Sequence, residues 1–484
     1  MNNLHSITRF AKYKKSDFLR SVDCAAGFKV LFHAFFGRGM YLENRWAETL
    51  DSFSSPRTLS DGAFIPWELL REFIGRGFVV RADESEREII ENHYLAYTPT
   101  APSGLCLNMA AICNFRCFHC IHYAGSNLDA RSLRPARMPF ETARLAIDWV
   151  ADGLRETGQL QMVINFGGGE PLINWPVIAK VLEHSRRHVQ PFLNVRFSLN
   201  TNASLMTPQI IRTLKEQDVI IIASLDGLRT GNDIVRRTRS GRGTFDLVQH
   251  GFNRLDEGGL PVKALHVNLN SKNFDYLDHT FVDFLDRKKI RSITLEPDLT
   301  DRLAQPVSAL VEKVMSLKKA AREKRITVTG YWERPFARII QPETDPTAYF
   351  CRSISGKTVD VMPDGSLYCC SYTNLKLGDL KSFAQKGSAS QLLHNSRFKA
   401  VLDSRRIGRI ERCRGCELEG VCGGGCYATA AYALKRKDDG IVDYRCDFYR
   451  DITKKLLADA MEQSMPRRGK GAKGGSVKNR AGVM

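Results

Sequence analysis

From about residue 104 to residue 330, short apolar runs alternate with segments in which apolar residues recur at helical spacing. The short runs predict strands at 105–109, 162–166, 194–199, 219–225, 262–269 and 292–296. The segments between them predict helices over 140–154, 175–188, 208–216, 245–255 and 276–287. Strands that alternate with helices are typical of βα units joined into a parallel sheet. The pattern therefore predicts an α/β fold with six such units.

The first 100 residues follow a different pattern. Two strand-like runs at 27–36 and 39–44 are separated by Gly37 and Arg38, which predicts a β-hairpin. Helical stretches follow as far as Val80. We expect this segment to form a small domain of its own in front of the βα units.

Length and charge limit the classes of protein to consider. A chain of 484 residues is long enough for two to four domains. Six positive charges of the net +18 lie between Pro466 and Met484, where no acidic residue occurs and no apolar periodicity exists. We expect residues 464–484 to be a disordered basic tail. The remaining basicity favours an acidic peptide over a nucleic acid as a partner, and we expect no nucleic-acid partner.

The chain shows no targeting or membrane signal. No basic region followed by a long apolar run begins the sequence, and no later stretch reaches the uncharged length that a bilayer requires. We therefore expect a cytoplasmic protein without a membrane partner. Thirteen cysteines in such a chain favour metal ligation over disulfides, since the cytosol keeps thiols reduced.

Three of these cysteines, Cys113, Cys117 and Cys120, form a C-x3-C-x2-C loop directly after the first predicted strand. Three thiolates can bind three irons of a [4Fe-4S] cluster and leave the fourth iron open to another ligand. A structural zinc site is the alternative, although such sites use four ligands, usually in two close pairs.

This loop resembles that of the radical S-adenosylmethionine (SAM) superfamily, whose fold is a partial (βα)6 TIM-like barrel with its active site at the carboxyl ends of the strands. The resemblance implies that the open iron binds SAM, whose cleavage yields a 5'-deoxyadenosyl radical that abstracts a hydrogen atom from a substrate. The family's GGEP motif, which binds the methionine amino group, matches Gly168, Gly169 and Glu170 with the following proline. By the same resemblance Ser198 and Asn200 contact the ribose and carboxylate, and Arg236 faces the carboxylate. His119 falls at the usually aromatic position beside the adenine.

The cysteines beyond residue 350 resemble the SPASM domain, which holds two auxiliary iron–sulfur clusters. The resemblance assigns the outer cluster to Cys413, Cys416, Cys422 and Cys446, and the inner cluster to Cys351, Cys370 and Cys426. The inner cluster then lacks one thiolate, because the position of the missing ligand is Lys357. If residues 367–370 are extended, Cys369 points away from Cys370 and cannot join it. We therefore expect an open coordination site on the inner cluster; zinc in place of these clusters is the alternative.

The predicted domains are residues 1–100, 101–330 and 331–463, followed by the tail at 464–484. The first resembles the winged-helix-like domain with which many peptide-modifying radical SAM enzymes recognise a leader peptide, by adding a strand to a sheet edge. An extension that merely packs on the barrel is the alternative.

Several reactions fit this arrangement. Sulfatase maturases carry an aspartate directly after the cysteine equivalent to Cys370, but here that residue is Ser371, which argues against formylglycine formation. We expect a maturase that forms an intrachain crosslink in a precursor peptide or small partner protein, with electrons from a flavodoxin or ferredoxin. Oxidation or epimerisation of a single residue is the alternative, and a non-enzymatic iron–sulfur sensor is a further one. The sequence identifies no catalytic acid or base.

Overall fold

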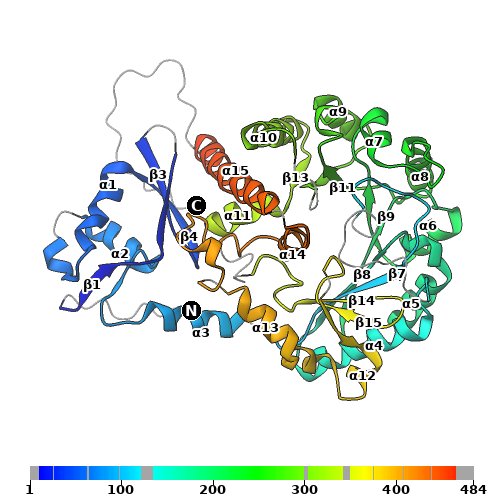
Figure 1. Cartoon of the computed structure of the whole chain (residues 1–484), viewed down its shortest axis with the longest axis horizontal. Helices are drawn as coiled ribbons and strands as arrows, with labels where there is room; N and C mark the ends of the chain where they lie inside the picture. The colour runs from blue at the N-terminus through cyan, green and yellow to red at the C-terminus, as the bar shows by residue number, and fades with distance from the viewer. Residues whose placement is uncertain are drawn as a thin grey trace.

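The computed structural model describes residues 10–24, 27–62, 65–97, 99–120, 135–298, 303–341, 349–373, 375–406, 408–437 and 439–464. The predicted basic tail lies outside these ranges, apart from its first residue. The centre of the fold is a ten-stranded sheet in the order β13-β12-β11-β10-β9-β8-β7-β14-β15-β16. Helices surround the strands on their outer side in Figure 1. The sheet places the carboxyl ends of its parallel strands along one edge, where the loops with the candidate residues begin.

Six parallel strands correspond to the predicted βα units. They are β7 (Gly104–Ala110), β8 (Gln161–Gly168), β9 (Asn194–Thr201), β10 (Ile220–Ser224), β11 (Ala264–Leu269) and β12 (Ser292–Pro297). The helices between and after them are α4 (Phe140–Glu156), α5 (Trp175–His188), α6 (Pro208–Glu216), α7 (Arg229–Val235), α8 (Phe245–Glu257), α9 (His279–Arg287) and α10 (Val307–Glu323). The predicted α/β class and all six strands are confirmed.

One helix starts later than its pattern indicates. The apolar pattern predicts a helix from residue 276, but α9 begins at His279 because the Asp278 side chain accepts a hydrogen bond from the Thr280 amide at 2.9 Å. Such a cap satisfies an amide that the first helical turn leaves unpaired. Residues 274–276 form a separate short 3-10 turn instead.

The sheet extends beyond the six predicted strands at both ends. At one end β13 (Thr327–Thr329) pairs in parallel with β12. At the other, β14 (Thr358–Val361) pairs in parallel with β7, and β15 (Ser366–Tyr368) and β16 (Lys376–Asp379) continue the sheet in antiparallel pairs. The cysteine-rich segment is thus joined to the barrel through the strand that leads into the C-x3-C-x2-C loop.

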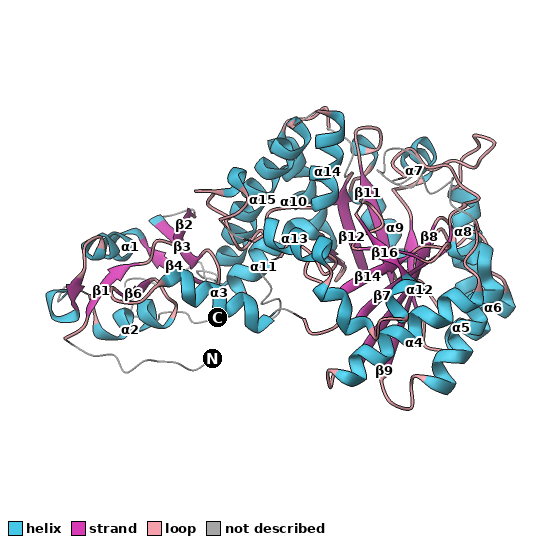
Figure 2. Ribbon diagram, turned by 60° about the horizontal axis from the view of Figure 1, so that its bottom comes forward, coloured by secondary structure: helices cyan, strands magenta, loops and turns pink. Residues whose placement is uncertain are grey.

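The N-terminal segment forms two small sheets, seen to the left of the barrel in Figure 2. One has the order β5-β1-β6 and the other β2-β3-β4. Their strands are β1 (Lys12–Lys15), β2 (Leu19–Asp23), β3 (Phe28–His33), β4 (Gly37–Glu43), β5 (Arg57–Thr58) and β6 (Val79–Arg81). The helices are α1 (Asn44–Thr49), α2 (Trp67–Gly75) and α3 (Glu86–Tyr97). The predicted hairpin is confirmed as the antiparallel pair β3–β4, and the segment has an apolar core of its own around Phe53, Phe73 and Phe78.

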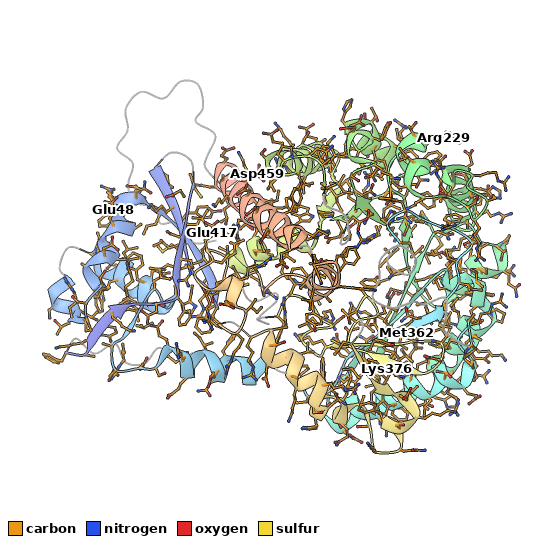
Figure 3. All side chains as sticks on the ribbon, in the orientation of Figure 1. Glu48, Arg229, Met362, Lys376, Glu417 and Asp459 are labelled. Carbon is orange, nitrogen blue, oxygen red and sulfur yellow. The ribbon has the colours of Figure 1, made fainter. Side chains whose placement is uncertain are left out.

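Part of the C-terminal segment lies between the N-terminal sheets and the barrel, and part of it packs on the outside of the barrel beside α4. Its helices are α11 (Arg334–Ile340), α12 (Leu380–Ala384), α13 (Ser396–Ser404), α14 (Tyr427–Arg436) and α15 (Gly440–Ser464). Figure 3 labels Asp459 on α15, whose carboxylate pairs with Arg322 of α10 at 2.8 Å. On the other side, the Tyr41 hydroxyl of β4 donates to the Leu457 carbonyl at 2.9 Å. Helix α15 therefore holds the N-terminal unit against the barrel.

Candidate functional site

The C-x3-C-x2-C loop follows β7 at the carboxyl edge of the sheet, and backbone hydrogen bonds fix its shape. The amides of Arg116 and Phe118 donate to the carbonyls of Arg237 and Val235, at 2.7 and 2.8 Å. These carbonyls belong to the segment at the end of α7, so the loop is bound to a part of the chain more than 100 residues further on. The loop therefore depends on tertiary contacts rather than on its own sequence for its conformation.

The three thiols of this loop influence one another and are largely removed from water. The pKa of Cys113 is raised to about 12, mainly by burial. The Phe115 amide lowers this pKa, while the neighbouring Glu170, Cys117 and Cys120 add to the rise. Thiols in such surroundings ionise only beside a cation, and a bound metal ion is such a cation. The donor set, three adjacent thiols in a desolvated loop, fits an iron–sulfur cluster with one open iron.

The glycine run after β8 packs directly on the start of the cysteine loop. The amides of Gly169 and Glu170 donate to the carbonyls of Ala110 and Ile112, at 2.7 and 3.0 Å. A Cβ atom on Gly168, whose φ is +109°, would lie 2.6 Å from the Ala110 carbonyl oxygen, and one on Gly169 would overlap that of Ile112. Only glycine permits this approach, and the GGEP segment thereby supports the cysteine loop. That these glycines also contact SAM stays a prediction.

Glu170 has a definite structural role at the same place. Its carboxylate is 1% exposed and accepts hydrogen bonds from the Thr201 hydroxyl at 2.7 Å and the Asn202 amide at 2.9 Å. The Leu172 amide donates a third at 3.2 Å. Burial raises the pKa of Glu170 to about 7, and the three donors oppose the rise. Glu170 thus ties the end of β8 to the end of β9.

A buried ion pair lies beside the cysteine loop. The Arg236 guanidinium donates to both Asp226 oxygens at 2.6 and 3.0 Å, while its third nitrogen lies 4.0 Å from the Cys117 sulfur. Burial is the largest single effect and would lower the pKa of Arg236 and raise that of Asp226. The neighbouring charges and the hydrogen bonds of the pair together outweigh it, so the pKa of Arg236 is raised and that of Asp226 is lowered. Asp226 therefore occupies two of the three guanidinium nitrogens of Arg236. The sequence did not reveal this pairing. The contact of Arg236 with a SAM carboxylate stays a prediction.

His119 faces the same carboxylate. Its Nε2 lies 3.4 Å from Asp226 Oδ2, and burial lowers its pKa to about 4. Its Nδ1 is buried and has no hydrogen-bond partner among the described residues. A buried ring nitrogen without a partner leaves room for a ligand's polar group, which fits a nucleoside ligand beside this loop. The predicted stacking on adenine stays a prediction.

Polar side chains share the inner face of the barrel because side chains alternate along each strand. The Ser198 hydroxyl donates to Asn165 Oδ1 at 3.1 Å, and Asn200 is exposed two residues further along β9. On β12, Glu296 accepts a hydrogen bond from the Tyr331 amide, and burial raises its pKa to about 7. Glu296 is not among the site residues predicted from the sequence. Its only signal there is its place in a strand whose polar and apolar positions alternate.

The inner group of C-terminal cysteines lies next to the barrel. Burial raises the pKa of Cys370 well above its usual range, and Asp360, Cys351 and Cys426 raise it further. Strand β15 ends at Tyr368, so the extended segment considered for residues 367–370 stops two residues short of Cys370. The Cys369 thiol donates to the Ser353 carbonyl at 3.2 Å, and Cys351 is among the groups that raise its pKa. The alternation argument against Cys369 therefore does not apply, and Cys369 is a further candidate ligand.

The four cysteines of the outer group line one cavity, which Cys426 of the inner group also lines. Cys413, Cys416, Cys422 and Cys446 line it together with Arg450, whose guanidinium lies 4.0 Å from the Cys416 sulfur. Burial raises the pKa of Cys446 to about 11. Among the described residues no three Cys, His, Asp or Glu side chains converge on a single ion. A cluster needs a wider arrangement, since each thiolate binds a different iron.

Comparison with known proteins identifies the class. The sequence profile of the radical SAM superfamily matches residues 107–284, the span from β7 to α9. Residues 107–284 therefore form a radical SAM domain, and such a domain implies a [4Fe-4S] cluster and SAM as cofactors.

Individual relatives point in the same direction. The chain is 24% identical over 450 residues to the radical SAM cyclopropyl synthase TigE of Paramaledivibacter caminithermalis, covering 88% of this chain and 92% of the relative. It is 25% identical over 346 residues to the mycofactocin maturase MftC of Mycolicibacterium smegmatis, covering 68% of this chain and 79% of the relative. The fold is similar to that of Streptococcus suis SuiB bound to its precursor peptide SuiA, with a TM-score of 0.53, 14% identity and coverage of 88% and 97%. In the part of the chain that the structure describes, no helix is long and apolar enough to cross a membrane.

Proposed function

We propose that this radical SAM enzyme is a maturase of a ribosomally made peptide or small partner protein, in which it forms an intrachain crosslink. The observation that carries the proposal is the free edge of strand β2. Among the described residues β2 pairs only with β3, whereas β4, at the other side of that sheet, packs against α11. A free edge can accept an extended peptide as an additional strand.

The register shows which backbone groups of β2 are available. The Cys24 amide donates to the Phe28 carbonyl, and the Ala34 amide donates to the Phe18 carbonyl, both at 2.8 Å. In an antiparallel pair the hydrogen-bonded positions alternate, so Ser21 and Asp23 direct their backbone groups away from β3. These outward groups are the proposed contact for a leader segment.

The edge is also connected to the cysteine-rich segment. The Arg20 guanidinium pairs with Glu419 at 3.2 Å, and Glu419 in turn accepts a hydrogen bond from the Gly415 amide at 3.3 Å. Gly415 and Glu419 flank Cys416, a proposed ligand of the outer auxiliary cluster. A peptide bound at the edge of β2 would therefore lie beside the cysteine-rich segment that contains Cys416.

The same proposal includes two auxiliary clusters. The inner cluster is held by Cys351, Cys370 and Cys426, and the outer cluster by the four outer cysteines. Making a new bond after hydrogen abstraction requires loss of one electron, which an auxiliary cluster can accept. A flavodoxin- or ferredoxin-type protein supplies the electron that starts each cycle. The relatives support this proposal, since one is named a mycofactocin maturase and another was crystallised with a precursor peptide.

Oxidation of a single residue is a second candidate, because a carboxylate does lie beside Ser371. Asp360 of β14 accepts a hydrogen bond from the Ser371 amide at 2.7 Å, and burial raises its pKa to about 6. It is 6% exposed and close enough to the inner cysteines to raise the pKa of Cys370, so a proton acceptor here could serve either reaction.

Co-expression with candidate precursor peptides, followed by tandem mass spectrometry, separates the two. Both reactions remove two hydrogens, but only a crosslink joins the fragments of two residues. Ser21→Pro removes an outward amide of β2, whereas Ser21→Ala keeps it, so the proposal predicts loss of peptide binding of about tenfold or more for the first variant only. Equal binding by both variants, or modification without joined fragments, would contradict the proposal.

A further inference from the structure

Five basic residues lie on and around the outside of the cysteine loop. Arg116 is in the loop itself; Arg237, Arg239 and Arg242 belong to the turn between α7 and α8; and Lys272 follows β11. All five are exposed. None of them makes an ion pair with any described residue. Five charges without an ion-pair partner in the described part of the chain thus gather at one place.

The arginines are attached to the loop through the backbone. Thr238 forms an antiparallel bridge with Phe115, and Arg237 forms another with Gly243. The Thr238 amide also donates across the turn to the Arg242 carbonyl, at 2.8 Å. Backbone hydrogen bonds therefore attach the turn 237–243 to the cysteine loop, and its charged residues lie beside the three thiols.

Two acids close to these charges, among the residues that the structure describes, have other partners. Asp233 accepts hydrogen bonds from the amides of Thr244 and Phe245, both at 2.8 Å. Asp246 pairs with Arg229, which Figure 3 labels on α7. An apolar element accompanies the charges, since the Phe118 ring is 40% exposed and Lys272 lies 4.0 Å from its centre. The surface thus combines an exposed aromatic ring with a basic rim.

We propose that this surface, defined by Arg116, Phe118, Arg237, Arg239, Arg242 and Lys272, is the docking site of an acidic one-electron donor protein. Electron transfer falls steeply with distance, so a donor must dock where the cysteine loop reaches the surface. Complementary charge steers such encounters and orients the two proteins. One electron leaves the donor, which is oxidised by one electron, and enters the chain, where SAM cleavage consumes it.

This inference rests on the flavodoxin- or ferredoxin-type donor of the proposed function, but it is independent of the peptide. The surface lies beside α7 and α8, on the side of the molecule opposite the N-terminal sheets in both Figure 1 and Figure 2. A donor docked here would leave the proposed peptide site free. Nucleic acid is the other macromolecule that a basic surface could bind, but the position of this one on the cysteine loop favours an electron donor.

Binding of purified flavodoxin to the reconstituted full-length enzyme tests the proposal directly. The variant is Arg239→Glu with Arg242→Glu, and the matched control is Arg71→Glu with Arg186→Glu, exposed arginines of α2 and α5 that change the net charge equally. We expect the test variant to weaken flavodoxin binding about tenfold or more at low salt, and the difference to shrink at high salt. The control should bind as the unaltered enzyme does.

A second readout is the ratio of 5'-deoxyadenosine release driven by reduced flavodoxin to that driven by dithionite. The ratio should fall in the test variant alone, since dithionite needs no docking surface. Flavodoxin binding that is equal in both variants would overturn the proposal. So would a test variant that loses binding of a short DNA duplex but keeps flavodoxin. Failure to modify any peptide would contradict the proposed function, but it would not affect the outcome of the flavodoxin experiment.

Discussion

Asp226→Asn tests whether the buried ion pair beside the cysteine loop holds that loop in place. Asp226 is fully buried and Arg236 is 7% exposed, so the substitution leaves a guanidinium in the interior without its counter-charge. Removing one partner of such a pair costs about 3–5 kcal/mol. Val235 and Arg237, on either side of Arg236, carry the carbonyls that bind the loop amides. The free energy of opening the loop should therefore fall by a similar amount.

Hydrogen–deuterium exchange of peptides that cover residues 113–120 measures this opening in the cluster-free protein. A loss of about 3–5 kcal/mol corresponds to exchange that is about a hundredfold to several thousandfold faster, because each 1.4 kcal/mol is about a factor of ten. Asp246→Asn is the matched control, since it breaks the exposed pair with Arg229. An exposed pair contributes up to about 1 kcal/mol, so its loss should change exchange by less than about sixfold.

The double variant Asp226→Leu with Arg236→Met adds a further check. It removes both charges, and replacing a buried pair by apolar groups is often close to neutral for stability. Loop protection should then return toward that of the unaltered chain. Equal exchange rates in Asp226→Asn and Asp246→Asn would refute the structural role assigned to the buried pair.

Three further changes test other parts of the molecule. Gly169→Ala places a Cβ atom on the Ile112 carbonyl oxygen, and should reduce the iron retained per chain after reconstitution; iron content equal to that of a Gly158→Ala control would argue against the packing described. Burial raises the pKa of Glu296 from 4.5 to about 7, so the folded chain keeps a proton that the unfolded chain releases between these values, and stability falls as the pH rises through this window. Glu296→Gln should remove up to about 3 kcal/mol of that fall, seen as a smaller difference between thermal unfolding at pH 5 and pH 7; an unaltered difference would contradict the cause assigned. Removal of residues 466–484 should leave SAM cleavage unchanged, and its loss would revive a role for the basic tail.

The sequence predicted those parts of the fold that local patterns determine. The strands from β7 to β12 are apolar on their buried positions, and their helices carry apolar stripes, so periodicity located all six units. Strands β13 to β16 have only three or four residues each, too few for a periodic signal. Strand β14 also pairs with β7, about 250 residues earlier, and no local pattern specifies such a partner.

The candidate site divides in the same way. Cysteine spacing was enough to place the three thiols at residues 113–120 in one site, because a short loop keeps them close together. Asp226 and Arg236 are ten residues apart, and only the path of the chain through α7 brings their side chains together. Asp360 has the appearance of an ordinary polar residue in a strand, and its place beside Ser371 follows from the pairing of β14 with β15.

Radical SAM chemistry in this chain is tested most directly by 5'-deoxyadenosine release from the anaerobically reconstituted enzyme with SAM and dithionite. We expect release from the unaltered chain, with about eight or more irons per chain, and no release from Cys117→Ala. An unaltered chain that retains iron at its cysteines but leaves SAM intact under strong reductant would contradict this mechanism.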